Sequence, residues 1–259
     1  MNAIQFVPGA IDAGGCVSNA WDMLKKNYGM YLGIAIVAML LTGCIPCLNI
    51  FIMGPIMGGV FFVALRDMRG EPVDFGMMFK GFEKFVPLMV IGLIQSIPGV
   101  IAQILRFTID IGQIGLGGKN GDYQFFQSGD NSVLAGGLAL IGVVVGLVFM
   151  VIAIVWWMIM FFAIPLAMEN EIGPIDAIKL SARAAMSNIG GLFVLMIFEI
   201  LVMLVGVLMI CVGAFLISFP LILIANVFAF RQVFPWAGQQ FNMAPPPPNA
   251  YGSSFGSGM

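Results

Sequence analysis

An acidic residue inside an apolar segment is the first candidate for chemistry. Glu199 stands alone in the apolar segment 190–230. Burying a charged acid at the centre of a spanning helix costs about 2.5–3.5 kcal/mol, so this side chain must be neutral, paired or hydrated. It could carry protons, or it could be a protonated carboxyl that hydrogen-bonds to the helix with Gln95 and Gln103. Glu199, Gln95 and Gln103 thus form a predicted intramembrane polar site, with both roles open.

The second candidate is a pair of cysteines, Cys44 and Cys47, with the spacing of a redox motif. On the outer face of a membrane, such a pair could form a disulfide. Thioredoxin-like chemistry needs a βαβ context, which this sequence does not predict. Cysteine is also an ordinary small apolar residue in membrane helices. A structural disulfide between Cys44 and Cys47 is therefore one hypothesis beside redox chemistry and plain packing.

The composition gives no support to other kinds of chemistry. The chain has no histidine, and two or three cysteines with no nearby acid are a poor ligand set for zinc. The net charge is −2, without the clustered Lys and Arg that phosphate binding requires, which argues against nucleic acid. No nucleophile–base pair or phosphate-binding loop is visible. We predict no enzymatic activity, no metal and no cofactor.

Four long apolar tracts must position these candidate residues. Hydrophobic residues make up 60% of the chain and charged residues 9%, far below the quarter that is usual in soluble proteins. A helix needs about 20 apolar residues to cross the hydrocarbon core. The first and last tracts break at 45–49 and 211–213 and read as hairpins, whereas polar residues 106–132 separate two single helices. The prediction is an all-α membrane protein with six transmembrane helices, from the tracts 30–65, 86–105, 133–167 and 190–230.

Basic residues near the predicted helix ends indicate the orientation. Nine of them share one side, and only Arg106 and Lys119 lie on the other. The positive-inside rule then places both termini in the cytoplasm of a bacterial inner-membrane protein. The expected division is a cytoplasmic segment 1–29, a membrane domain 30–235, and a disordered cytoplasmic tail 236–259 rich in Pro, Gly and Ser. The nine basic residues are Lys25, Lys26, Arg66, Arg69, Lys80, Lys84, Lys179, Arg183 and Arg231.

A short motif that ends in aspartate occurs three times, at 9–12, 71–74 and 173–176. Aspartate is a good N-cap, so Asp12, Asp74 and Asp176 could each start a helix. An amphipathic stretch follows each motif, with the apolar stripe and separate charges of a helix that lies in the membrane interface. The chain therefore reads as three hairpin-like units, each preceded by an interfacial helix. Such repeats occur in transporters and in membrane proteins without a transport role.

Four short motifs stand out: Trp21-Asp22-Met23-Leu24-Lys25-Lys26-Asn27, Gly54-Pro55-Ile56-Met57-Gly58-Gly59, Leu65-Arg66-Asp67-Met68-Arg69-Gly70 and Phe79-Lys80-Gly81-Phe82. Together they resemble a bacterial family of uncharacterised multi-span membrane proteins. That family is related to the membrane domain of glycerophosphoryl diester phosphodiesterases. The resemblance implies a fold and not an activity, because the catalytic domain of some relatives needs histidines that this chain lacks.

These observations favour a non-enzymatic scaffold or accessory subunit in envelope or lipid-related processes. Its expected partners are the lipid bilayer and another membrane protein, and no nucleic acid. The alternative is a small secondary transporter or channel with Glu199 in its polar path, together with Gln95 and Gln103.

Overall fold

The computed structural model describes residues 4–43, 46–115, 132–209 and 213–236, and these residues form helices without any strand. Cys44, most of the predicted loop 106–132 and the tail 237–259 lie outside them. The elements are α1 (Ala13–Lys26), α2 (Tyr28–Gly43), α3 (Pro46–Met68), the 3₁₀ helix η1 (Phe75–Lys84), α4 (Phe85–Gly115), α5 (Ser132–Met160), α6 (Ala163–Glu169), α7 (Pro174–Ser187), α8 (Ile189–Leu208), the short π-helix η3 (Ala214–Ser218) and α9 (Phe219–Val233).

Within the described part of the chain, five helical stretches are long and apolar enough to cross a membrane. They correspond to α3, to η1 with α4, to α5 with α6, to α8, and to η3 with α9. The all-helical membrane class predicted from composition is therefore confirmed. Helix α2 is apolar but has only 16 residues, so a sixth span stays a prediction.

The tract 133–167 was expected to be one helix, and the structure breaks it between α5 and α6. Residues Phe161 and Phe162 form a turn there. Ser181 of α7 stabilises the break, because its hydroxyl donates to the carbonyl of Ile159 at 2.6 Å and accepts from the backbone N–H of Phe162 at 3.1 Å. A buried backbone group without such a partner would be costly. The turn thus depends on a distant serine that the hydropathy of the tract could not indicate.

The predicted start of the loop 106–132 is wrong, because the helix before it is longer than expected. Helix α4 continues through Arg106 to Gly115, so the first ten residues of that loop are helical. Apolar residues still alternate with the few polar ones in this stretch, and extending an existing helix is much easier than nucleating a new one.

The three aspartate motifs precede helices, but only two aspartates act as caps. The Asp12 carboxylate accepts from the Gly15 N–H, and that of Asp74 accepts from the Gly76 N–H. Helix α7 starts earlier than predicted, because Pro174 occupies its first turn and Gly173 is the N-cap without a side-chain bond. Proline suits that position, since its missing N–H would be unpaired there anyway. Asp176 therefore lies inside the first turn. A membrane-surface position for the three helices stays a prediction.

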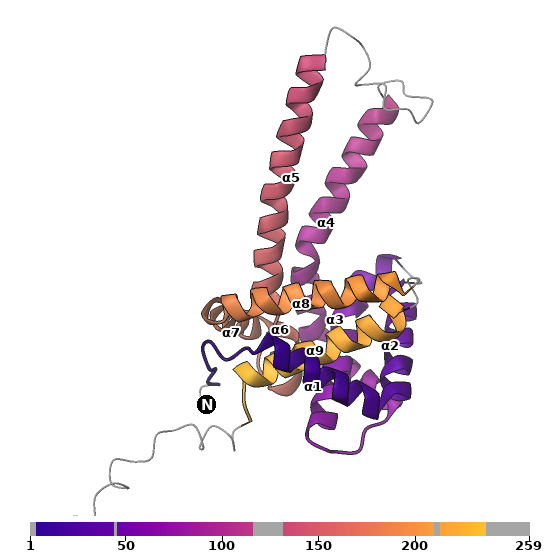
Figure 1. Cartoon of the computed structure of the whole chain (residues 1–259), viewed down its shortest axis with the longest axis vertical. Coiled ribbons are helices and arrows are strands. Elements are labelled where there is room, and N and C mark those ends of the chain that lie inside the picture. Colours follow the sequence, from indigo (N-terminus) through magenta and orange to yellow (C-terminus); the bar gives the residue numbers. More distant parts are fainter. Residues whose placement is uncertain (1–3, 44–45, 116–131, 210–212, 237–259) are drawn as a thin grey trace, which may run out of the picture.

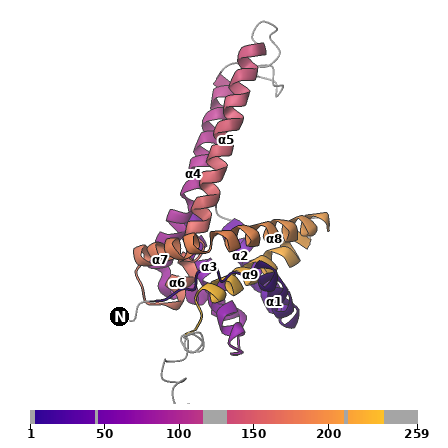
Figure 2. The same ribbon diagram turned by 60° about the vertical axis from the view of Figure 1, so that its left-hand side comes forward.

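Helices α4 and α5 extend together away from the rest of the molecule, whereas α8 and α9 run crosswise at their base (Figures 1 and 2). Helices α3 and α9 lie at the centre of the fold. About half of an 18-residue apolar stretch is buried in α3 (50%) and α9 (56%), but only 17% in α4 and in α8. The apolar surfaces of α4, α5 and α8 therefore face outward, as expected of surfaces that contact lipid or another protein.

Glycines in the motifs of the family resemblance allow α3, η1 and α4 to touch through their backbones. A Cβ atom at Gly54 would collide with the Leu88 carbonyl, one at Gly59 with that of Met78, and one at Gly81 with that of Pro55. Small residues let helices approach closely in this way. Gly54 and Gly58 of α3 both lie in close contact with Leu88 of α4.

Another two motifs of the resemblance meet through side chains. Asp67 at the end of α3 accepts hydrogen bonds from Asn27 Nδ2 at 3.1 Å and from the Tyr31 hydroxyl at 2.8 Å. Asn27 forms the junction between α1 and α2, so these bonds hold that junction against α3. The motifs thus have a structural role.

Candidate functional site

Glu199 lies in α8 and lines an apolar groove between α5 and α8. The residue is 9% exposed, and its Oε1 atom has no hydrogen-bond partner among the described residues. The groove has a volume of about 500 Å³, within the range of small-ligand sites. Its lining consists of Met150, Ala153, Ile154 and Trp157 of α5 and Met196, Glu199, Ile200 and Met203 of α8.

The two glutamines of the predicted polar site do not line this groove. Gln95 is half-buried in α4, and Gln103 is exposed further along the same helix. The polar contact seen between α4 and α5 is a different one, in which Trp156 Nε1 donates to the carbonyl of Ile94 at 3.2 Å. A polar site shared by Glu199, Gln95 and Gln103 therefore stays a prediction.

The cysteine pair cannot be evaluated in the described residues. Cys44 lies outside them, and Cys47 is in the first turn of α3 with its side chain undescribed. The disulfide stays a prediction. The structure instead describes a free, fully buried cysteine, Cys16 of α1, whose Sγ donates to Gln232 Oε1 at 3.4 Å. Burial, with smaller contributions from the charges of Asp12 and Glu199, raises the pKa of this thiol from 9.0 to about 12.

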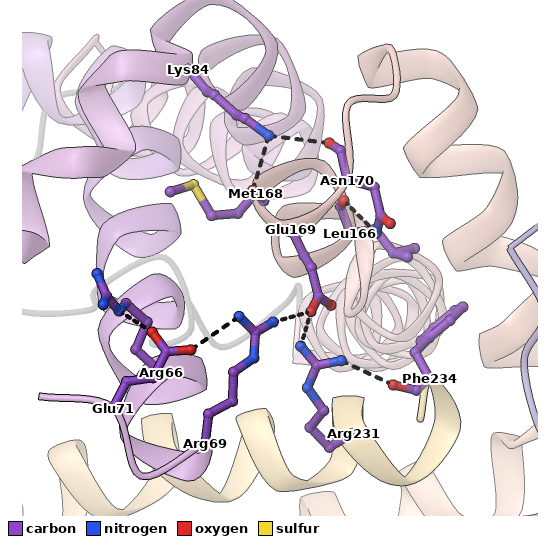
Figure 3. Close-up of polar contacts among 10 residues, drawn as sticks. All are labelled: Arg66, Arg69, Glu71, Lys84, Leu166, Met168, Glu169, Asn170, Arg231 and Phe234. Atoms are coloured by element: carbon purple, nitrogen blue, oxygen red, sulfur yellow. Dashed lines mark hydrogen bonds and ion pairs between the residues drawn. The ribbon is translucent and has the colours of Figure 1, made fainter. Parts of the chain in front are cut away.

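A cluster of charged residues forms where the ends of α3, α6 and α9 meet (Figure 3). We call it the Glu169 cluster; it contains Arg66, Arg69, Glu71, Glu169 and Arg231. Glu169 accepts from both Arg69, at 2.9 Å, and Arg231. Glu71 pairs with Arg66 at 2.7 Å and with Arg69 at 3.7 Å.

Further contacts shield the centre of the Glu169 cluster from water. Arg231 also donates to the carbonyl of Phe234 at 3.2 Å, and its guanidinium lies 4.7 Å from the ring centre of Trp236. The Arg69 guanidinium is 5.6 Å from the same ring. Side-chain exposure falls to 8% for Arg231 and 18% for Glu169. Such a shielded pair is held strongly in place, since neither partner can exchange its contact for water.

Lys84 joins η1 to α6 next to this cluster (Figure 3). Its Nζ donates to the carbonyls of Ala167, Met168 and Asn170 at 3.0–3.2 Å. The last carbonyls of a helix have no partner within it, and a cation there is favourable. Lys84 therefore fixes the short helix α6 to the segment that leads into α4.

Residues before α1 bind both α9 and the junction of α7 with α8. The Val7 N–H donates to the Val233 carbonyl at 2.9 Å, and the Ala10 N–H donates to Asn188 Oδ1 at 2.9 Å. Asn188 Nδ2 in turn donates to the carbonyls of Val7 and Ala184. The buried Asn188 thereby connects segments from the two ends of the chain.

The charges of the Glu169 cluster have a structural role, because they bond elements of the fold to one another. Within the described residues, each side chain of the Glu169 cluster has a partner, and no group of three potential metal ligands occurs. In the sequence, Lys84 and Arg231 indicated only the orientation, and Arg66 and Arg69 also belonged to a motif of the family resemblance. Glu169 was missed. The sequence did contain a signal for Glu169: it is an acid at the end of a predicted span, on the side of the membrane where the basic residues gather. Opposite charges attract, so an ion pair with one of these basic residues could have been expected.

Comparison with protein-family models, with curated proteins and with solved structures finds no match for this chain. The relation to the membrane domain of glycerophosphoryl diester phosphodiesterases therefore stays a prediction from short motifs. The class of the protein follows from its own residues. With five stretches that can each cross a bilayer, it is a multi-pass membrane protein.

Proposed function

We propose that this protein is a non-enzymatic scaffold or accessory subunit of the bacterial cytoplasmic membrane, and that the α4–α5 hairpin docks onto a partner membrane protein. The main observation that supports this proposal is the exposure of the α4–α5 hairpin. Only 11% of an 18-residue apolar stretch of α5 with α6 is buried, although α9 reaches 56% (Figure 1). The excess of basic residues on one side supports cytoplasmic termini, and the family resemblance favours an envelope or lipid-related process.

Glycines on the hairpin support a partner helix as the occupant. A Cβ atom at Gly99 of α4 or at Gly146 of α5 would meet no described atom within 4 Å. Gly54 and Gly58 of α3, by contrast, are in tight contact with α4. Because small residues permit close helix approach, Gly146 offers another helix the kind of contact that α3 already uses internally.

The base of the hairpin is firmly attached, as a docking arm requires. Trp156 connects α5 to α4, Ser181 holds the end of α5, and Lys84 fixes the segment before α4. A partner bound to the outer part of the hairpin would therefore be held in a defined position relative to the rest of the protein.

Site-specific photo-crosslinking in native membranes tests this proposal. A crosslinking phenylalanine analogue replaces Val145, which is 60% exposed on α5, or Val205, which is 59% exposed on α8, as the matched control. We expect a discrete protein adduct at Val145 and none at Val205. Gly146→Leu should remove the adduct, whereas Gly190→Leu, at an equally open position on α8, should leave it unchanged.

Two results would contradict the docking role. One is the absence of a protein adduct at Val145, which would leave lipid as the neighbour of the hairpin. The other is an adduct that persists in the Gly146→Leu variant, because a leucine there would displace a closely packed helix.

A small transporter or channel is the second candidate, and the buried acid Glu199 is the observation that favours it. Intramembrane acids commonly lie on proton or ion paths. Protein reconstituted in vesicles with an internal pH dye would then carry protons under an imposed potential, and Glu199→Gln would abolish the flux. Equal flux in both proteins would remove this candidate.

A further inference from the structure

We propose that the α4–α5 hairpin extends about 18 Å beyond the outer surface of the membrane, and that the partner covers this outer part with an apolar protein surface that carries an acidic residue opposite Arg106. This inference rests on the docking role proposed above and states where on the hairpin the partner binds. It has its own test, because the position of the hairpin relative to the lipid can be measured without the partner.

The length of α4 places Arg106 at the outer surface of the membrane. Lys84, which binds the end of α6, lies on the predicted cytoplasmic side. Arg106 follows Lys84 by 22 residues, or about 33 Å of helix, which matches a hydrocarbon core of about 30 Å. No charged residue lies between these two cations. Arg106 is therefore the point at which α4 leaves the hydrocarbon core.

The end of α4 has the pattern of a helix in water. Gln103, Arg106, Asp110 and Gln113 recur at intervals of three and four residues, which places them on one face of the helix, and most of the other residues there are apolar. A charged residue such as Asp110 would be costly in the core of the bilayer. Gln103, which does not line the groove at Glu199, belongs to this outer polar face.

Helix α5 continues well past the level of Arg106. The indole of Trp156 donates to the carbonyl of Ile94, so these two residues lie at the same height in the hairpin. From Ile94 to Arg106, α4 rises by 12 residues, about 18 Å, whereas α5 extends over 24 residues, about 36 Å, from Trp156 back to Ser132. The two helices run alongside each other in both views (Figures 1 and 2). About 18 Å of α5 therefore lies beyond Arg106.

This outer part of α5 is apolar on every face, unlike the end of α4. Residues 133–143 include no charged or polar residue. Val143, Val144 and Val145 are 59%, 58% and 60% exposed, although consecutive residues of a helix point in different directions, so no described element covers α5 at this level. A continuous apolar surface in water marks a site of protein interaction.

The covering surface must also provide a partner for Arg106. This residue is exposed and forms no ion pair with any described residue, and its apolar neighbours Leu105 and Phe107 are 52% and 66% exposed. A protein surface that excluded water here would leave the cation unpaired unless it brought an acid. An apolar surface with a carboxylate at this level is therefore complementary to the hairpin.

Cysteine labelling in two preparations tests the inference. Variants without the native cysteines are treated with a membrane-impermeant maleimide, as purified protein in lipid nanodiscs and in spheroplasts. Ala139→Cys on α5 should be labelled fast in nanodiscs, because the site lies outside the lipid, and at least about tenfold more slowly in spheroplasts, where the partner covers it. Asp110→Cys, on the polar face of α4, should be labelled fast in both. Val151→Cys, which replaces a residue that is 56% exposed but lies within the core, should be labelled in neither.

The acidic residue of the partner has a separate test. Arg106→Glu should restore fast labelling of Ala139→Cys in spheroplasts, because two acids would then face each other. Arg183→Glu, which changes an exposed cation of α7 on the predicted cytoplasmic side, should leave the site protected. Protection that persists in the Arg106→Glu variant would overturn the inference.

Two other results would overturn the inference and leave the docking role intact. One is slow labelling of Ala139→Cys in nanodiscs together with a crosslinked adduct at Val145, because the outer part of α5 would then lie in lipid. The other is fast labelling in both preparations together with that adduct, because the partner would then bind only within the membrane. The absence of both the adduct and the protection would instead remove the docking role itself, and this inference with it.

Discussion

Removing the carboxylate of Glu169 should strongly destabilise the protein. Glu169→Gln keeps the size of the side chain but leaves the guanidinium of Arg231, whose side chain is 8% exposed, without its anionic partner. Breaking one partner of a buried pair costs about 3–5 kcal/mol, because the remaining charge can neither pair nor be hydrated. Arg69 loses its closest contact to Glu169 too, but it keeps Glu71 and is 38% exposed, so it adds little.

A matched control is available in the exposed pair of Lys80 and Glu83. Glu83→Gln breaks an ion pair of 3.1 Å whose side chains are 43% and 68% exposed. Such pairs contribute about 0.2–1 kcal/mol. The free energy of unfolding, measured by denaturant titration in mixed detergent micelles, should therefore fall several times more for Glu169→Gln than for Glu83→Gln.

A double variant distinguishes two possible causes of the destabilisation: the loss of the ion pair itself, and the buried charge of Arg231 that is left without a partner. Glu169→Gln with Arg231→Met removes both charges and keeps most of the volume, so it should be more stable than Glu169→Gln alone. The reasoning would be refuted if Glu169→Gln behaved like Glu83→Gln. It would also be refuted if the double variant were no more stable than the single one, since the buried charge would then not be the cause.

Three further predictions concern Cys16 and Gly59. In a variant that retains only Cys16, iodoacetamide at pH 8.5 should label the denatured but not the native protein, because the pKa of about 12 keeps the thiol protonated; fast native labelling would disprove the burial. Because the pKa of Cys16 is higher in the folded than in the unfolded protein, its contribution to stability is complete below pH 9.0 and is lost between pH 9.0 and 12. The melting temperature of the Cys16→Ala variant should therefore fall less steeply over this pH range than that of the wild-type protein. Gly59→Ala should lower the melting temperature strongly, since its Cβ would strike the Met78 carbonyl, whereas Gly29→Ala, at an open position, should not.

Local signals in the sequence predicted those features that depend on neighbouring residues. The apolar tracts predicted membrane helices, because a helix satisfies its own backbone within one segment and needs only enough apolar residues to replace water with lipid. Asp12 and Asp74 marked helix starts for a similar reason, since a cap bonds to backbone only a few residues away.

Features that depend on distant partners were decided only by the tertiary structure. The break after α5 depends on Ser181, about twenty residues further along, and the Glu169 cluster joins residues up to 165 positions apart, from Arg66 to Arg231. In the same way, the groove at Glu199 exists because α8 crosses α5. The sequence by itself determined the membrane class and most helix positions, because hydropathy and capping act within a segment. Which buried polar groups find partners was decided by packing, because that depends on which segments meet in space.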